Sequence, residues 1–174
     1  AFFHSPLIDY TAIVFQFLAG INFTLLYMSL FKWRFGAVIT NPEFKFYVAT
    51  TVVATLWVMF LLVTRLDYSW EHALRSSLFQ VVSMMTTTGL FCENVGLWPH
   101  ITWIILGVLM FMGACAGSTT GGFKCVRCVM LLKVLRNEFR HILHPSAVLP
   151  VRLGGMSVPQ SKLISLLAFF TLYV

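Results

Sequence analysis

Residues 69–90 read SWEHALRSSLFQVVSMMTTTGL, and this stretch decides the fold. Its helical part, about four turns long, is too short to cross a bilayer. Ser69 is placed to cap this helix, and Glu71 lies in its first turn. The stretch ends in three threonines and a glycine, residues 86–89. A short helix followed by such a segment predicts a re-entrant pore hairpin.

The composition around the hairpin is that of a membrane protein. The 174 residues are 59% hydrophobic and 10% charged, whereas soluble domains carry roughly 25% charged residues. The apolar excess must therefore face lipid. A net charge of +6 would suggest nucleic acid in a soluble protein, but here the basic residues follow the membrane topology, so we expect no nucleic-acid partner. Because the chain lacks an initiator Met and stops inside an apolar run, we expect an internal piece of a longer protein.

Two apolar segments precede the hairpin. Residues 8–31 and 46–64 are each long enough to span as a helix. Between them, residues 32–45 predict a loop, with the turn signal Asn41-Pro42.

A third apolar segment follows the hairpin and has a break in it. Residues 101–135 predict a span that the run GACAGSTTGG, residues 113–122, interrupts. Residues 136–162 predict a cytoplasmic linker, and residues 163–174 begin another helix. The expected fold class is therefore an all-α membrane protein with a broken helix after its pore loop.

The distribution of charge predicts the orientation. The side that holds residues 32–45 and 124–162 has ten Lys/Arg and two acids, and the side that holds residues 1–9 and 65–100 has two Lys/Arg and four acids. Basic loops stay cytoplasmic, so the hairpin should face outward. The basic run itself has two interpretations, contact with anionic lipid or docking of a cytosolic partner. It comprises Arg127, Lys133, Arg136, Arg140 and Arg152.

Residues 81–91, VVSMMTTTGLF, have the chemistry of a cation filter. Extended backbone at membrane depth is tolerated where it lines a wet cavity, and its carbonyls can replace the hydration shell of a monovalent cation. Gly89 supplies dihedrals closed to other residues. We expect the hydroxyls of Thr86, Thr87 and Thr88 to hold the strand from behind, and Glu93 to concentrate cations outside. The alternative is a simple turn between two helices.

The break in the third segment is a second candidate site. Glycine costs about 1 kcal/mol per helical position, so the run should unwind. Its candidate residues are Gly113, Ala116, Gly117, Ser118, Thr119, Thr120, Gly121, Gly122 and Lys124. A charge such as Lys124 at this depth is costly and tends to be functional. The alternative is close helix packing by small residues.

No motif of the chain indicates an enzyme. Cys125-x-x-Cys128 has no second pair, and His141-x-x-His144 has no acidic or cysteine partner nearby, so we expect no metal site beyond the transported ion. The chain has no G-x-S-x-G sequence, no Walker loop and no paired carboxylates.

The hairpin resembles the third pore loop of TrkH/TrkG-type potassium uptake proteins, in the wider Trk/Ktr/HKT superfamily. Four further stretches share the resemblance in the same order: VFQFLAGINF (14–23), NPEFKFY (41–47), GACAGSTTGGFKCVRCVMLLK (113–133) and HPSAVLPVRLGG (144–155).

This resemblance implies K⁺-channel-like helix–pore loop–helix repeats. Residues 1–31 would end the second of four repeats, and residues 163–174 would open the fourth. Residues 46–135 would form the third, with an outer helix (46–64), a pore helix (69–85), a filter (86–90) and a broken helix (101–135). By motif match, Thr86, Thr87, Thr88 and Gly89 would bind K⁺.

The resemblance also implies an intramembrane gate at residues 113–124. The chain departs from the family's usual Phe at Leu90 and from its usual Gly at Ala114 and Thr120. As partners it implies membrane lipid, a second copy in a homodimer and a cytosolic nucleotide-binding regulatory subunit (TrkA-like). The implied location is the bacterial inner membrane, with K⁺ transported and no organic cofactor.

Three functions compete on these residues. The first is gated K⁺ uptake, with weaker discrimination against Na⁺ than a TVGYG filter because the strand has one glycine. The second is a secondary transporter with a midplane substrate site at the broken helix. The third is an assembly subunit that conducts nothing.

Overall fold

The computed structural model describes residues 5–33, 35–143, 152–153, 156–157 and 159–173. Its elements, in order, are α1 (Pro6–Ala19), α2 (Phe23–Lys32), α3 (Phe35–Thr40), α4 (Pro42–Leu66), α5 (Trp70–Met85), the 3₁₀ turn η1 (Val95–Leu97), α6 (His100–Met112), α7 (Cys125–Leu143), β1 (Arg152–Leu153), β2 (Met156–Ser157) and α8 (Gln160–Tyr173). Except for β1 and β2, which pair antiparallel over two residues, the elements are helical. The all-α prediction is confirmed.

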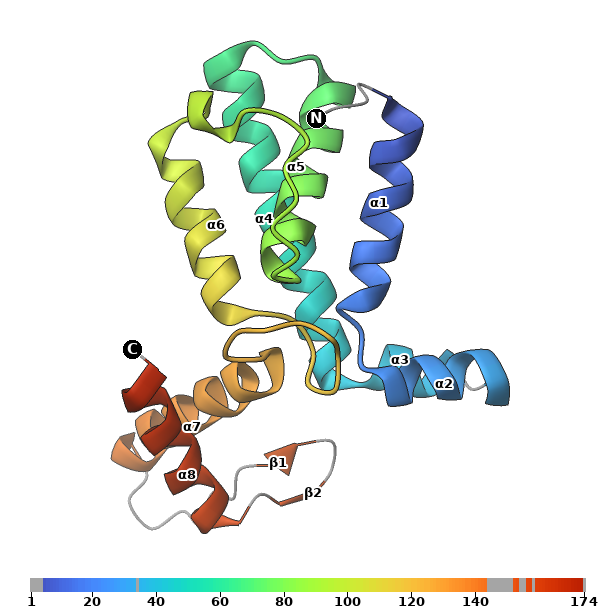
Figure 1. Cartoon of the computed structure of the whole chain (residues 1–174). Helices are drawn as coiled ribbons and strands as arrows, with labels where there is room; N and C mark the ends of the chain where they lie inside the picture. Colours follow the sequence, from blue (N-terminus) through green and yellow to red (C-terminus); the bar gives the residue numbers. More distant parts are fainter. Residues whose placement is uncertain (1–4, 34, 144–151, 154–155, 158, 174) are drawn as a thin grey trace.

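Four helices, α1, α4, α5 and α6, stand side by side as an upright bundle (Figure 1). The short helix α5 packs against each of the other three. Its Ala73, Val81 and Met85 side chains are fully buried, as are Val58 and Leu62 of α4. The core therefore surrounds α5 and fixes where its C-terminal end lies.

Only α4, among the described helices, is by itself long and apolar enough to cross a membrane. The sequence predicts this span from residue 46, but α4 starts at Pro42. The Asn41 side chain caps it by accepting hydrogen bonds from Glu43 N (2.9 Å) and Phe44 N (3.3 Å). A proline at the first helical position suits a helix start, so Asn41-Pro42 is a cap and not a turn.

The prediction of one continuous helix over residues 8–31 is wrong. The segment forms α1 and α2, which meet at an angle of 103°. A side chain at Gly20 would overlap the Tyr47 hydroxyl, and the Asn22 side chain accepts from Thr24 N (2.8 Å) as the N-cap of α2. Packing at Gly20 and the cap at Asn22 thus end one helix and begin another. The predicted loop over 32–45 likewise contains α3 and the first turn of α4.

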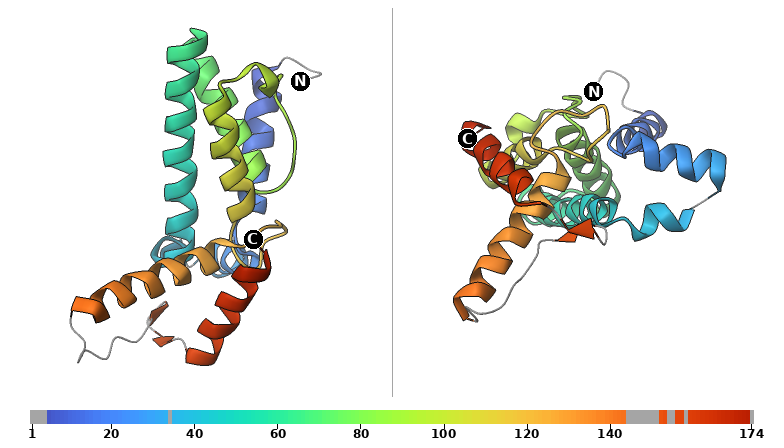
Figure 2. Two further views of the ribbon diagram at one scale, coloured as in Figure 1. Left: turned by 90° about the vertical axis from the view of Figure 1, so that its left-hand side faces the viewer. Right: turned by 90° about the horizontal axis from the view of Figure 1, so that it is seen from below.

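The broken segment begins as α6, which ends at Met112, and resumes as α7 at Cys125. Helix α7 runs across the base of the bundle instead of continuing α6 (Figure 2). It also extends to Leu143, eight residues into the stretch predicted as linker. Residues 113–124, here named the small-residue loop, lie beneath the lower end of α5 (Figure 1).

Candidate functional site

The end of α5 sets the geometry of the site. Thr88 N donates to Ser83 O (2.9 Å) and Thr87 N donates to Met84 O (3.1 Å), with Thr87 in the left-handed region at φ 53°. These two bonds and that conformation make a Schellman motif, in which glycine is the usual left-handed residue. A β-branched threonine there costs roughly 1–2 kcal/mol. Such strain persists where the surroundings hold it and is typical of functional sites.

Residues 86–90, here named the Thr-Gly strand, turn back upward from this point. Gly89 has φ 73°, and residues 87–91 are all exposed. Among the described residues, no hydrogen bond is accepted by a carbonyl oxygen of residues 86–89. Backbone oxygens with no protein partner beside exposed space are what coordination of a dehydrated cation requires. The C-terminal end of α5 adds a partial negative charge at the same place.

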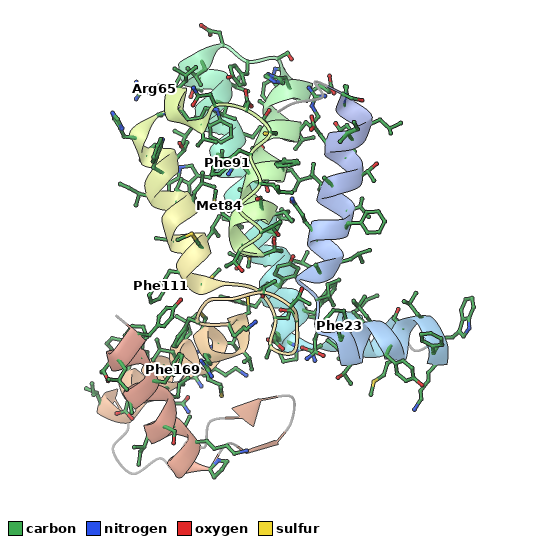
Figure 3. The ribbon with its side chains drawn as sticks, in the orientation of Figure 1. Phe23, Arg65, Met84, Phe91, Phe111 and Phe169 are labelled. Atoms are coloured by element: carbon green, nitrogen blue, oxygen red, sulfur yellow. The ribbon has the colours of Figure 1, made fainter. Side chains whose placement is uncertain are left out.

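The hydroxyls of Thr86 and Thr88 hold the strand on the side of α5. The Thr87 hydroxyl does not, because it bonds to Gly121 N of the small-residue loop. The Thr86 hydroxyl bonds to Val82 O (2.7 Å) and lies 2.7 Å from the Thr88 hydroxyl. Ser83 Oγ donates to Leu90 O (2.7 Å) and ties the upper end of the strand to α5. The Leu90 side chain is 50% exposed. Figure 3 labels Met84 and Phe91, which flank this strand in sequence.

Glu93 lies in a polar pocket of about 290 Å³ beyond the strand, together with Asp9, His72 and Arg75. Its carboxylate accepts from the Tyr68 hydroxyl (3.1 Å) and lies 3.9 Å from His72 Nε2. Burial and this carboxylate raise the pKa of Tyr68, so the phenol donates in its neutral form. In the same pocket, Arg75 lies 3.8 Å from the Asp9 carboxylate, and the role of Glu93 in concentrating cations stays a prediction.

Backbone hydrogen bonds join the two ends of the small-residue loop. Phe123 N donates to Phe111 O (3.0 Å) and Cys125 N donates to Ala114 O (2.9 Å). Gly113 and Gly122 have φ values of 69° and 84°, and a side chain on Gly122 would come within 2.9 Å of the Gly113 Cα. This close approach is what requires glycine at both ends.

One bond joins the small-residue loop to the Thr-Gly strand. Gly121 N donates to Thr87 Oγ1 over 2.8 Å. The Lys124 ammonium donates to Thr120 O and lies 3.3 Å from Thr120 Oγ1. The two candidate sites predicted separately from the sequence therefore meet, and Thr87 is the residue where they meet.

The other side of the loop is bonded to the α1–α2 corner. Cys115 N donates to Gly20 O and Phe23 N donates to Gly117 O, each over 3.1 Å. Ser118 Oγ and Thr120 Oγ1 lie 2.8 Å apart inside the loop, and Thr119 Oγ1 reaches Ala19 O at 3.4 Å.

Glu43 also belongs to this site, although the sequence does not predict it there. This residue is 7% exposed, and its carboxylate accepts a hydrogen bond from Ala116 N, 73 residues away. Glu43 directly follows Pro42 at the start of a helix, beside an apolar span. A single acid in that position is a signal that could have identified this residue.

A pocket of about 490 Å³ lies where the strand, the loop and α8 approach one another. It is lined by Met84, Thr87, Gly89, Gly107, Met110, Phe111, Gly122 and Tyr173. Phe111 and Phe169, labelled in Figure 3, belong to an aromatic cluster with Phe123 and Tyr173 at this level. In the described part of the chain, no three His, Cys, Asp or Glu residues gather as metal ligands.

Comparisons with known proteins agree on one family. A family model described as "TrkH: Cation transport protein" matches residues 1–174. The Trk system potassium uptake protein TrkH of Escherichia coli (strain K12) is 33% identical over 175 residues, which cover 99% of this chain and 36% of that protein. TrkG of the same strain is 31% identical over 176 residues, with the same coverage. An uncharacterized cation transporter of Methanocaldococcus jannaschii is 39% identical over 98 residues, covering 56% of this chain and 21% of that one.

A solved structure agrees as well. The potassium transporter TrkH from Vibrio parahaemolyticus superposes with a TM-score of 0.91 at 31% identity, over 97% of this chain and 37% of that one. The chain thus spans about a third of the length of the relatives it matches.

Proposed function

The chain belongs to the TrkH family of cation transport proteins, and from this premise we propose that it supplies one filter strand and the gate beneath it to a K⁺ uptake protein. The single observation that carries the proposal is the Thr-Gly strand, which is exposed from Thr87 onward and whose carbonyl oxygens at residues 86–89 accept no hydrogen bond in the described structure. K⁺ is the transported substrate, and the strand would offer it backbone oxygens in place of water.

The gate would be the small-residue loop. It lies directly beneath the strand and is bonded to Thr87 through Gly121 N (2.8 Å). Four of its residues, Gly113, Gly117, Gly122 and Lys124, have positive φ, so its backbone is far from helical. A loop held by a few hydrogen bonds can adopt a second arrangement that clears the path, and the Lys124 charge near the path opposes a cation while the loop stays in place.

Orientation and partners complete the proposal. The hairpin faces outward and the basic segments lie on the cytoplasmic side of a bacterial inner membrane, in contact with lipid. The membrane subunit is a homodimer and binds a TrkA-like nucleotide-binding subunit. Arg136 and Arg140 support a docking surface, because they are exposed and lie one turn apart on α7, across the base of the bundle.

The alternative, a transporter with an organic substrate at the midplane, has less support. Among the described residues, the pocket between strand and loop is lined by no charged side chain, so it offers no partner for the charged group of an amino acid or organic acid. Uptake experiments with the full-length parent separate the possibilities. Growth of K⁺-uptake-deficient cells at low K⁺, with saturable Rb⁺ uptake, supports our proposal. Failure of both, with the protein present in the membrane, refutes it.

A further inference from the structure

A buried carboxylate that the filter does not use lies against the small-residue loop. Glu43 lies in the first turn of α4, and Asn41 holds that turn by accepting from Glu43 N and Phe44 N. The Glu43 backbone is therefore part of the longest helix of the bundle, Pro42–Leu66. Its side chain is 7% exposed. A charge removed from water in this way needs compensating partners.

In the described part of the chain, the partners of the Glu43 carboxylate come from the small-residue loop. Its Oε1 accepts from Ala116 N, near the beginning of the loop. The positive charge of Lys124, at the end of the loop, also attracts the carboxylate. One side chain on α4 therefore bonds to the beginning of the segment that lies under the Thr-Gly strand and is attracted to the charge at its end.

We infer that Glu43 is the positioning residue that holds the small-residue loop beneath the Thr-Gly strand. This inference rests on the proposed function in treating the loop as the gate. A hydrogen bond to an ionised acceptor is about twice as strong as a neutral one, so the bond from Ala116 N to the carboxylate should exceed each neutral backbone bond between the loop and the α1–α2 corner. Glu43 acts through Ala116 and does not touch the ion.

The loop contains its own reporter, because Cys115 precedes Ala116 and is fully buried. Cys92, near the outer pocket and 8% exposed, reports on the rest of the fold in the same sample. The test compares Glu43→Gln with the parent in the purified full-length protein, by following N-ethylmaleimide labelling of each cysteine by mass spectrometry. A matched control is Glu138→Gln, which neutralises an exposed acid on α7.

Loss of the charged acceptor should increase the labelling rate of Cys115 about tenfold, which corresponds to ~1.4 kcal/mol in the opening equilibrium. The rate at Cys92 and both rates in Glu138→Gln should not change. A second variant, Ala116→Pro, removes the donor N–H and leaves Glu43 intact. It should have the same effect as Glu43→Gln, and the double variant should add little to either.

Two results would overturn the inference. One is an unchanged Cys115 rate in both Glu43→Gln and Ala116→Pro. The other is an equal rise at Cys115 and Cys92, which would show that Glu43 stabilises the whole fold and not the loop. Rb⁺ uptake by the same variants tests the proposed function separately. Faster Cys115 labelling without higher uptake would leave the role of Glu43 intact and refute gating by the loop.

Discussion

Gly89 is the position at which the proposed filter is most open to a sharp test. Its φ of 73° is one that residues with a Cβ rarely adopt, yet a Cβ built there would meet no atom within 4 Å. Gly89→Ala therefore adds strain without a clash. The left-handed conformation costs an alanine roughly 1–2 kcal/mol, and the strand can relieve this cost by rotating the peptide groups on either side of residue 89.

Rotation of these peptide groups would turn carbonyl oxygens away from the ion. We expect the apparent affinity for K⁺ to fall by about 5- to 30-fold, the equivalent of 1–2 kcal/mol, with weaker exclusion of Na⁺. The assay is the initial rate of Rb⁺ uptake by K⁺-uptake-deficient cells that produce the full-length protein, over a range of K⁺ and Na⁺ concentrations. A fall in maximal rate alone would indicate less protein, so the amount in the membrane is measured in parallel.

The matched control is Gly36→Ala. Gly36 lies in α3, away from the Thr-Gly strand, with no positive φ and no atom within 4 Å of a built Cβ. The same chemical change should there leave K⁺ affinity unaltered. If Gly89→Ala behaved like Gly36→Ala in both affinity and Na⁺ inhibition, the carbonyls near residue 89 would not be ligands and the reasoning would be refuted.

Three further outcomes follow from the same geometry. Deleting residues 117–121 should raise K⁺ flux, and unchanged flux in a correctly folded protein would count against gating. Thr87→Val removes the acceptor of the 2.8 Å bond from Gly121 N, which should weaken the attachment of the loop to the strand by about 1 kcal/mol. K⁺ flux should therefore rise severalfold. Thr87→Ser keeps the hydroxyl and should match the parent. Because the strand has one glycine, Na⁺ should be measurable as a permeant ion when Na⁺ and K⁺ compete in a flux assay, and a complete absence of Na⁺ flux would contradict that expectation.

The helix that carries the strand could be predicted from the sequence because its signals are local. Helix α5 runs from Trp70 to Met85, where the sequence predicts a short helix. The signals are the short length of the apolar stretch, the acid Glu71 in its first turn, and the glycine-containing segment that follows it. The sequence predicts Ser69 as the N-cap, and Ser69 occupies that position, although its side chain makes no capping hydrogen bond. The break after Met112 was likewise visible as a cluster of small residues.

Long-range contacts account for what the sequence did not reveal. The corner between α1 and α2 depends on Tyr47 of α4, which fills the space beside Gly20. The pattern of residues 8–31 alone cannot predict this contact, because Tyr47 lies on another helix. Glu43 lies 73 residues from Ala116, so their bond has no local signature. Thr87 was grouped with its two neighbours, yet only its hydroxyl turns toward the loop, because its left-handed backbone reverses the direction of the side chain.

The central claim is that the backbone oxygens of the Thr-Gly strand coordinate the transported ion. Its most direct test is a crystal structure of the full-length protein grown with Tl⁺ in place of K⁺, in which anomalous scattering locates the ion. We predict an anomalous peak within coordination distance of the carbonyl oxygens of residues 87–89. Peaks confined to other parts of the protein, with this strand ordered and without an ion beside it, would contradict the account.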